Sequence, residues 1–519
     1  MSGGTIQILI AMAVYMLAVI GIGLFFAKRA NQNSDNYFLG GRTLGPWIAA
    51  MSAEASDMSG WLLMGLPGVA YWCGLADAAW TAIGLAVGTY LNWLLVSKRL
   101  RRYSAVADNA ITIPDFFSNR FHDKKKILMS IAAIFILVFF TVYAASCFVT
   151  CGKLFSTLFG FSYLSMMIAG AIFVIVYTFL GGFLAESTSD FMQSIVMIVA
   201  LVSLVVVATI TAGGSAQILE NVKGIPGFFE FFGIASPTVA DGVQQVSGGQ
   251  AVFGAAAPYG FLTIISTLSW GLGYFGMPQV LLRFMAIRKV GELKTSRRIA
   301  TTWAVISMGA AVIIGLVGRV LYPTALATSG QAESVFILLS TNLLPPLLAG
   351  LAMAGILAAT ISSSDSYLLI AASAFSKNLF QGVLKKDATD KQVMTVSRIV
   401  LVSIAVLGMI IASDESSIIF KIVSFAWAGF GATFGPIMLF SLFWKRTTKE
   451  GAIAGMLAGG IMVFVWKLVL RPMGGVLGIY ELLPAFLFSC IFIVVVSLLT
   501  KEPSAEILDE FEKAKTYEY

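Results

Sequence analysis

The chain has 519 residues, of which 58% are apolar and only 12% are charged. Together with a mean hydropathy of +0.88, this composition excludes a soluble domain and predicts a protein that crosses a membrane many times. The formal net charge of +7 is confined to a few loops, which gives no support to nucleic-acid binding. His122 is the only histidine and the four cysteines form no metal-type CxxC pair, which argues against metal or histidine catalysis.

Apolar stretches of about 20 residues suffice to cross a bilayer. The first, residues 6–27, is too long for a signal peptide and precedes Lys28 and Arg29, so it predicts a spanning helix. The chain after Lys501 is polar and acidic and is expected to form a short solvated helix or to be disordered. The thirteen predicted spans cover residues 6–27, 46–73, 76–96, 127–152, 163–182, 190–212, 259–285, 298–322, 346–376, 394–412, 417–443, 451–470 and 478–499.

Lys and Arg divide the connecting loops into two kinds. Most loops after odd-numbered spans are basic, whereas those after even-numbered spans are nearly free of Lys and Arg. Because basic loops stay in the cytoplasm, this pattern predicts an external N-terminus and a cytoplasmic C-terminus. The turn after the fifth span is the exception, since it has no basic residue and carries Glu186 and Asp190. The basic loops comprise residues 98–126, 288–298, 377–391 and 445–449.

Two longer segments fall on the external side in this arrangement. Residues 213–258 are rich in Gly, Gln and Val and are expected to form a loop, with a surface helix over the pathway left open. Residues 335–344 are expected to form a short helix that ends at Pro345 and Pro346, because proline cannot continue a helix.

Residues 52–68, SAEASDMSGWLLMGLPG, lie inside a long apolar segment and yet carry Glu54 and Asp57. A charge at the centre of a bilayer costs at least ~2.5 kcal/mol, and backbone groups in lipid must be satisfied internally. A stretch with this many polar residues, glycines and a proline is tolerated where it faces protein or a water-filled cavity. We therefore predict a broken membrane helix, with ions and solute bound at the break.

A second interrupted helix is predicted within residues 266–284. Trp270, Tyr274 and Pro278 recur every four residues and so lie on one face of it. The alternative is an aromatic packing stripe with a proline kink. The residues that weaken this helix are Gly271, Gly273, Gly276 and Pro278.

The ninth span contains a mid-helix polar cluster, in which Asp365 is surrounded by Ser362, Ser363, Ser364 and Ser366. Membrane serines often bond to carbonyls of their own helix, but four hydroxyls and a carboxylate exceed what that explains. Hydroxyl, carbonyl and carboxylate oxygens are what an alkali cation needs in place of its water shell. For Asp190, a helix-start cap is the alternative to a functional role, because a carboxylate there complements the helix dipole.

The two interrupted spans are five helices apart, so residues 46–212 and 259–443 form two five-helix halves of opposite orientation. Inverted halves with paired broken helices are typical of secondary transporters. The sequence has no GxxxxGK[ST] motif, so a gradient is expected to supply the energy. The residues alone predict an ion-coupled carrier of a small solute, with a channel or a receptor as alternatives.

Four stretches resemble the solute:sodium symporter family: GGRTLGPWIAAMSAEASDMSGWLLMGLPG (40–68), ITIPDFFSNRF (111–121), YTFLGGFLAESTSD (177–190) and WGLGYFGMPQVLLRFMA (270–286). The resemblance covers nearly the whole chain. It implies an all-α polytopic protein with the LeuT-type inverted repeat and 13 transmembrane helices. One membrane domain would span residues 1–500, with extra helices at 6–27, 451–470 and 478–499 and a cytoplasmic tail at 501–519.

The resemblance also implies a sodium site and a solute pocket. Asp57 would support sodium affinity, and Asp190 would lie near the sodium exit route or at a second sodium site. The implied sodium ligands are the carbonyls of Ala55, Met58 and Ala359 and the hydroxyls of Ser362 and Ser363. The implied solute pocket comprises Ser59, Gly60, Trp61, Tyr143, Trp270, Tyr274 and Pro278.

This resemblance implies that Na⁺ is the coupling ion and that no other cofactor is needed. It also implies that the solute is L-proline. The protein would lie in the lipid of the plasma membrane and would be a transporter, not an enzyme. Glu54, Met277, Asp365 and Ser366 depart from the family pattern, which weakens the assignment of the solute more than that of the ion. A symporter for another small carboxylate, amino acid or sugar, and a membrane sensor on a symporter scaffold, are the alternatives.

Overall fold

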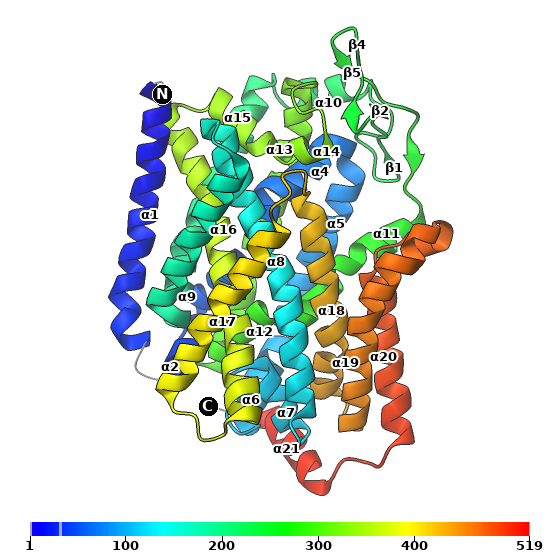
Figure 1. Ribbon diagram of the computed structural model, residues 1–519. Coiled ribbons are helices and arrows are strands. Elements are labelled where there is room, and N and C mark those ends of the chain that lie inside the picture. Colours follow the sequence, from blue (N-terminus) through cyan, green and yellow to red (C-terminus); the bar gives the residue numbers. More distant parts are fainter. Residues whose placement is uncertain (1–2, 31–33, 518–519) are drawn as a thin grey trace.

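The computed structural model describes residues 3–30 and 34–517, and the side chains of Lys28 and Arg29 lie outside that description. Within it, ten helices are long and apolar enough to cross a membrane. They stand roughly side by side, with the N-terminus at the upper face and the C-terminus at the lower face (Figure 1). The long helices are α1 (Gly3–Ala30), α5 (Leu75–Leu91), α8 (Ile127–Phe159), α9 (Tyr163–Thr211), α13 (Leu293–Leu321), α16 (Pro346–Ser373), α17 (Asp390–Ile411), α18 (Ile419–Phe443), α19 (Lys449–Val465) and α20 (Leu482–Leu499).

The first predicted break is present between α3 (Pro46–Gly60) and α4 (Leu66–Cys73). Ser59 leaves the helical region with φ 47° and ψ −171°, a conformation that is rare for a residue with a side chain. One wide turn, η2 (Trp61–Gly65), then restores the helix. A Cβ on Gly60 would lie 2.3 Å from the Thr150 hydroxyl, so the break also lies tightly against α8.

The second predicted break lies between α11 (Phe261–Leu268) and α12 (Pro278–Ala286). The connecting segment η4 (Ser269–Gly276) is a tight 3₁₀ helix. Its glycines let it approach α5 backbone to backbone, because a Cβ on Gly88 would lie 2.4 Å from the Gly271 carbonyl oxygen. Pro278 opens α12, where its missing N–H costs no helical hydrogen bond.

The predicted turn between the fifth and sixth spans is present, but it is sharper than expected. Helix α9 (Tyr163–Thr211) consists of two helical segments that meet at Gly182, which has φ 56° and ψ −167°. The hydroxyls of Tyr177 and Ser189 lie 2.5 Å apart across this turn, so the chain folds back on itself there. One glycine in this conformation redirects the chain, and the next residues can resume helix at once because each retains its N–H donor. Asp190 is therefore inside a helix and fully buried, so a helix-start cap is wrong.

The upper face carries the segments predicted as external. Residues 213–258 include the surface helix α10 (Ser215–Val222), and α15 (Val335–Leu343) ends just before Pro345 as expected. The structure adds the one-turn helix α14 (Ser329–Ala332) and three antiparallel pairs of two-residue strands that the sequence did not predict. Their strands are β1 (Gly233–Ile234) with β6 (Ala257–Pro258), β2 (Val239–Ala240) with β3 (Val243–Gln244), and β4 (Val246–Ser247) with β5 (Gln250–Ala251).

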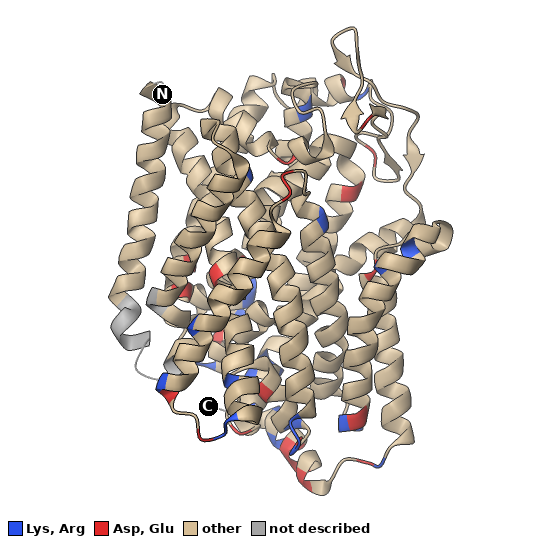
Figure 2. Ribbon diagram, viewed as in Figure 1, with Lys and Arg blue, Asp and Glu red and all other residues tan. Residues whose placement is uncertain are grey.

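The lower face gathers many of the charged residues (Figure 2). The basic segment after the third span folds into α6 (Ser97–Val106) and α7 (Ile113–Arg120). The C-terminal helix α21 (Ala505–Thr516) docks on them, and its Phe511 is 3% exposed. The tail is a short helix, which is one of the two expected alternatives, and it is solvated except on one face, where Phe511 lies beneath the guanidinium groups of Arg99 and Arg120. Glu510 of α21 also contacts the segment after α7, where His122 Nε2 lies 3.0 Å from its carboxylate.

Candidate functional site

The first break meets α16 through a cluster of oxygen atoms. The Ser362 hydroxyl donates to the Ala55 carbonyl at 2.8 Å, and the Ser363 hydroxyl donates to the same oxygen at 3.3 Å. Ser362 also lies 3.2 Å from the carbonyl of Ala359. Four of the five predicted sodium ligands therefore come together. The fifth, the Met58 carbonyl, accepts the backbone N–H of Trp61 across the break.

These oxygens suit an alkali cation. The serines are fully buried, and their hydroxyls and the two carbonyls offer neutral oxygen atoms at one point between two helices. Na⁺ bound there would replace the hydrogen bonds between Ser362, Ser363 and Ala55 with ion–oxygen contacts. It would thereby couple the position of α16 to that of α3.

Asp57 faces the other broken helix. Its carboxylate accepts the Tyr274 hydroxyl at 2.8 Å and the Gln279 amide at 3.2 Å. Its backbone carbonyl accepts the hydroxyls of Tyr143 and Tyr367, each at 3.5 Å. Asp57 thus ties α3 to η4, α8, α12 and α16, and it acts next to the cation cluster rather than within it.

An aromatic layer lies above Asp57. The rings of Trp61 and Trp270 are 5.7 Å apart, and the ring of Phe420 lies 6.0 Å from the first and 5.4 Å from the second. Trp427 donates its indole N–H to the Trp270 carbonyl at 2.8 Å, and Tyr480 stacks on Trp270 at 5.2 Å. The rings of Trp61 in η2, Trp270 in η4 and Phe420 at the start of α18 thus form one apolar layer between three helical segments.

The remaining predicted pocket residues surround the same centre. The Ser59 hydroxyl accepts the Trp61 backbone N–H at 3.2 Å, and Gly60 follows at the break. Tyr143 stacks on Tyr367 with ring centroids 4.3 Å apart. Pro278 is buried at the start of α12, one residue before Gln279.

A charged network lies below this centre, around the fully buried Arg283 of α12. The guanidinium donates to Ser52 at 2.9 Å, to Ser366 at 3.0 Å and to the Asp190 carboxylate at 3.1 Å, and it also pairs with Glu186. Ser52 in turn donates to Asp190 at 2.7 Å. Helices α3, α9, α12 and α16 are joined here, on the lower-face side of the cation cluster.

The carboxylates of this network outnumber its guanidinium group. Glu186, Asp190 and Asp365 are all buried around Arg283, and each has one oxygen without a hydrogen-bond partner in the described part of the chain. Asp190 therefore lies with Arg283 and not with the serines of the cation cluster. Glu54 is likewise 1% exposed with one unpartnered carboxylate oxygen among the described residues.

Sequence reasoning missed several contacts of this site. Tyr367 lies four residues after Ser363, so helical spacing could have placed it on the same face. Gln279 and Arg283 lie one turn apart in the quoted motif, and a buried arginine in an apolar helix was the signal. Phe420 and Trp427 belong to an aromatic helix that carries no distinguishing pattern, so only the fold brings them here.

A break in each of two membrane helices, a cluster of oxygen atoms suited to a cation and an aromatic enclosure together are typical of an ion-coupled membrane transporter. The Sodium:solute symporter family matches residues 37–459 of the sequence. The chain belongs to the sodium:solute symporter family. It is accordingly a multi-pass plasma membrane protein and a transporter rather than an enzyme, with Na⁺ as the coupling ion.

Similar proteins cover almost the entire chain. A sodium/proline symporter of Escherichia coli (strain K12) is 41% identical over 98% of this chain and 96% of its own length. A sodium/proline symporter of Haemophilus influenzae is 41% identical over 98% and 97%, and one of Staphylococcus aureus (strain USA300) is 39% identical over 98% and 96%.

Solved structures confirm the fold. A Na⁺-coupled sialic acid symporter in a substrate-bound outward-open state aligns with a TM-score of 0.76 at 18% identity, over 96% of this chain and 99% of that chain. MhsT in complex with L-phenylalanine aligns with a TM-score of 0.52 at 16% identity, over 87% and 97%. The chain thus has the LeuT-type transporter fold.

Proposed function

We propose that this protein is a secondary active symporter that imports L-proline together with Na⁺. The observation that carries this proposal is the meeting of the Ser362 and Ser363 hydroxyls with the Ala55 carbonyl at the break of α3. The proline part rests on the names of the relatives at about 40% identity. Ala55, Met58, Ala359, Ser362 and Ser363 would hold the ion, with Asp57 and Asp190 supporting it.

The solute would bind between the two breaks. Its carboxylate would meet the Ser59 hydroxyl and the N–H groups exposed at the break, since helix N-termini favour anions. Its apolar ring would pack on Trp270, and Tyr274 would link the pocket to Asp57. The pocket we propose comprises Ser59, Gly60, Trp61, Tyr143, Trp270, Tyr274 and Pro278.

Transport would proceed by alternating access. Na⁺ from outside would bind first and hold α3 against α16, which completes the pocket. The aromatic layer of Trp61, Trp270 and Phe420 would then close above the solute, and the Arg283 network would open below it. Na⁺ would leave past Asp190, whose pairing with Arg283 lies on the lower-face side of the ion cluster.

The proposed arrangement in the membrane has thirteen spans, an external N-terminus and a cytoplasmic C-terminus. Residues 46–212 and 259–443 would be the inverted halves of one domain over residues 1–500, with a cytoplasmic tail at 501–519. The clustering of Lys and Arg at the lower face, where the C-terminus lies, supports this orientation (Figure 2). Reporter fusions after each predicted span would test it, and an external C-terminal reporter would contradict it.

The decisive experiment is uptake by the purified full-length chain in proteoliposomes. An inward Na⁺ gradient should drive uptake of labelled L-proline, and an equal K⁺ gradient should not. Excess unlabelled amino acids, small carboxylates and sugars should compete less well than unlabelled L-proline. A better competitor would move the assignment to that solute, and Na⁺-independent uptake would overturn the ion site.

A pair of serine variants locates the ion within the same assay. Ser362→Ala removes a hydroxyl that faces Ala55, whereas Ser364→Ala removes one that bonds within its own helix to Thr360 at 2.6 Å. The first should raise the Na⁺ concentration for half-maximal uptake about tenfold, a loss of roughly 1.4 kcal/mol. The second should leave it unchanged. Equal effects of the two variants would contradict the site.

A further inference from the structure

Arg319 lies in the last turn of α13, at the upper face, and is only 1% exposed. Its guanidinium group lies 3.9 Å from the ring centroid of Tyr71 and 5.3 Å from that of Phe253. Nε donates to the Tyr71 carbonyl at 2.9 Å, and Nη1 donates to the Gln244 side-chain oxygen at 3.0 Å and to the Pro323 carbonyl at 2.7 Å. All three acceptors are neutral, so these contacts leave the buried positive charge without a counter-charge.

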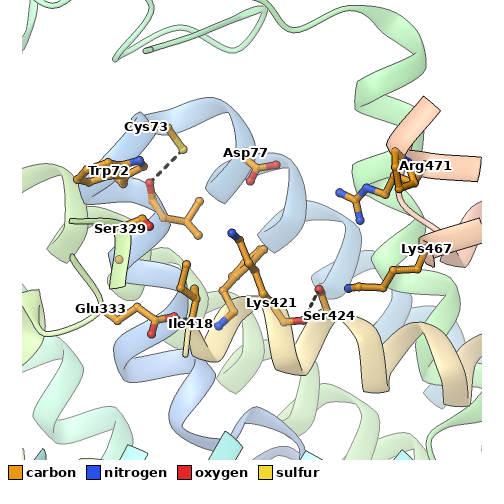
Figure 3. Close-up of a pocket in the computed structure, with 15 residues that line it drawn as sticks. Trp72, Cys73, Asp77, Ser329, Glu333, Ile418, Lys421, Ser424, Lys467 and Arg471 are labelled. Atoms are coloured by element: carbon orange, nitrogen blue, oxygen red, sulfur yellow. Dashed lines mark hydrogen bonds between the residues drawn. The ribbon is translucent and has the colours of Figure 1, made fainter. Parts of the chain in front are cut away.

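No carboxylate in the described part of the chain pairs with Arg319. Figure 3 shows two acidic side chains, Asp77 and Glu333, but they line a separate cavity. Glu333 pairs with Lys153 at 2.9 Å, and Asp77 accepts the Tyr259 hydroxyl at 2.8 Å. Buried charges in proteins are paired as a rule, so a buried arginine with neutral partners alone calls for a counter-ion.

The Nη2 group of Arg319 is the part available to such an ion. No described residue accepts either of its two N–H bonds. Arg319 also lines a cavity of about 520 Å³ between the end of α13, the end of α10 and β5. The exposed residues Asn221 and Gln250 bring side-chain amides to the same cavity, and no acidic residue of the described chain lines it.

We propose that this cavity binds a small monovalent anion, chloride, with Arg319 as its main ligand. Nη2 donates to the ion, and the amides of Asn221 and Gln250 complete its coordination. A halide fits this geometry better than a carboxylate or a phosphate, because Nε and Nη1 are already used and a bidentate contact needs a free edge of the guanidinium group. The inference concerns the anion alone and does not depend on the identity of the transported solute.

Arg319 joins three segments of the upper face. It lies at the end of α13 and contacts Tyr71 of α4 and Gln244 of β3. The backbone N–H of Gln244 donates to the Ala327 carbonyl at 2.7 Å, which ties the same junction to the segment before α14. A bound anion neutralises the charge of this junction and stabilises the folded chain, because it binds only where these segments meet.

Thermal unfolding of the purified full-length chain tests the site without any transported solute. At constant Na⁺, replacing gluconate by a large excess of chloride should raise the Tm by about 2–4 °C, since a ligand that binds only the folded state stabilises it. Bromide should act like chloride. An equal Tm in chloride and in gluconate would overturn the anion site.

Three variants distinguish a bound ion from a general effect of salt. Arg319→Gln should lose the chloride-dependent shift, although its Tm in gluconate is expected to be lower than that of the wild type. Asn221→Asp places a carboxylate in the cavity, where it takes the place of the ion, so its Tm should not depend on chloride. Asn342→Asp, the same change at an exposed position of α15 away from the cavity, should keep the wild-type shift. A shift of equal size in all three variants would overturn the site.

Anomalous diffraction from crystals grown in bromide locates the ion. A peak beside Arg319 Nη2 in the wild type, absent in Asn221→Asp, is the expected result. No peak in this cavity would contradict the proposal.

The anion site and the proposed function can fail separately. A chloride-dependent Tm that requires Arg319, in a protein without Na⁺-driven uptake of L-proline, would support the anion site and refute proline symport. Na⁺-driven uptake in a protein whose Tm is the same in chloride and in gluconate would refute the anion site and leave the proposed function standing.

Discussion

At the scale of single residues, the role we propose for Asp57 is to support an ion that it does not touch. Its oxygens accept hydrogen bonds from Tyr274 and Gln279, while the cation cluster lies at Ala55 and Ser362. A buried negative charge beside a cation site stabilises the bound ion through space, because the surrounding dielectric constant is low. Asp57 would therefore act in two ways. Its hydrogen bonds hold the break in α3 against Tyr274 and Gln279, and its charge would favour a cation near Ala55.

We expect Asp57→Asn to raise the Na⁺ requirement steeply while the protein still folds. The amide keeps the size of the side chain but loses the charge, and charged hydrogen bonds are worth about 1.5–3 kcal/mol, which corresponds to a shift of at least about tenfold. The Na⁺ dependence of uptake measures the shift, and size-exclusion chromatography checks folding. An unchanged Na⁺ dependence would remove Asp57 from the site.

We expect Trp270→Ala to weaken solute binding more than Na⁺ binding. The ring is 4% exposed and contacts Trp61, Phe420 and Tyr480, but no described hydrogen bond joins its side chain to the ion cluster. Solute KM and half-saturating Na⁺, measured on one preparation, give the comparison. An equal increase in the solute KM and in half-saturating Na⁺ would indicate that Trp270 only packs the protein interior. Trp444→Ala, at the lower face, is the control for the loss of an indole ring.

Residue chemistry alone pointed to the polar cluster of α16 but not to the charged network around Arg283. Serines and a carboxylate in mid-membrane have few uses other than ions, whereas the choice of Ser362 and Ser363 within that cluster came from the resemblance to the family. The partners of Asp190 could not be predicted, because Arg283 is 93 residues away along the chain and only the fold brings the two together.

At the scale of elements, glycine decides how closely helices approach. The break in α3 was predictable because Ser, Gly and Pro concentrate there, and the break at η4 was predictable for the same reason. The two helical segments of α9 were predicted as well, but the sharpness of the turn at Gly182 was not, since a short polar stretch after a glycine looks the same in sequence whether it forms a loop or resumes a helix at once.

We expect Gly88→Ala to destabilise the packing of α5 against η4. The new methyl group would lie 2.4 Å from the Gly271 carbonyl oxygen, so backbone must shift, and overpacking of this kind costs about 1–3 kcal/mol. Gly309→Ala is the matched control, because nothing lies within 4 Å of a Cβ there and α13 is also a membrane helix. A thermal melt in detergent should show a lower Tm for the first variant alone, and equal melting temperatures would contradict the close contact.

At the scale of the whole molecule, the pattern of spans and basic loops predicted an inverted-repeat transporter, because lipid forces polar residues into functional places. The docking of α21 was not predictable, since its Phe511 is one apolar residue in an acidic tail.

The last prediction concerns the energy available to the whole transporter. Moving one charge across ~100 mV supplies ~2.3 kcal/mol, and a tenfold Na⁺ gradient adds ~1.4 kcal/mol. For one Na⁺ per zwitterionic solute, the sum of ~3.7 kcal/mol supports roughly 500-fold accumulation, and the Na⁺ gradient alone supports about tenfold. Valinomycin and a K⁺ gradient can clamp proteoliposomes at ~100 mV, and equal K⁺ on both sides removes the potential. Accumulation should approach the first limit in the presence of the potential and the second limit in its absence. Accumulation near the square of these ratios would show two Na⁺ per solute, and accumulation that ignores the potential would show that no net charge crosses with the solute.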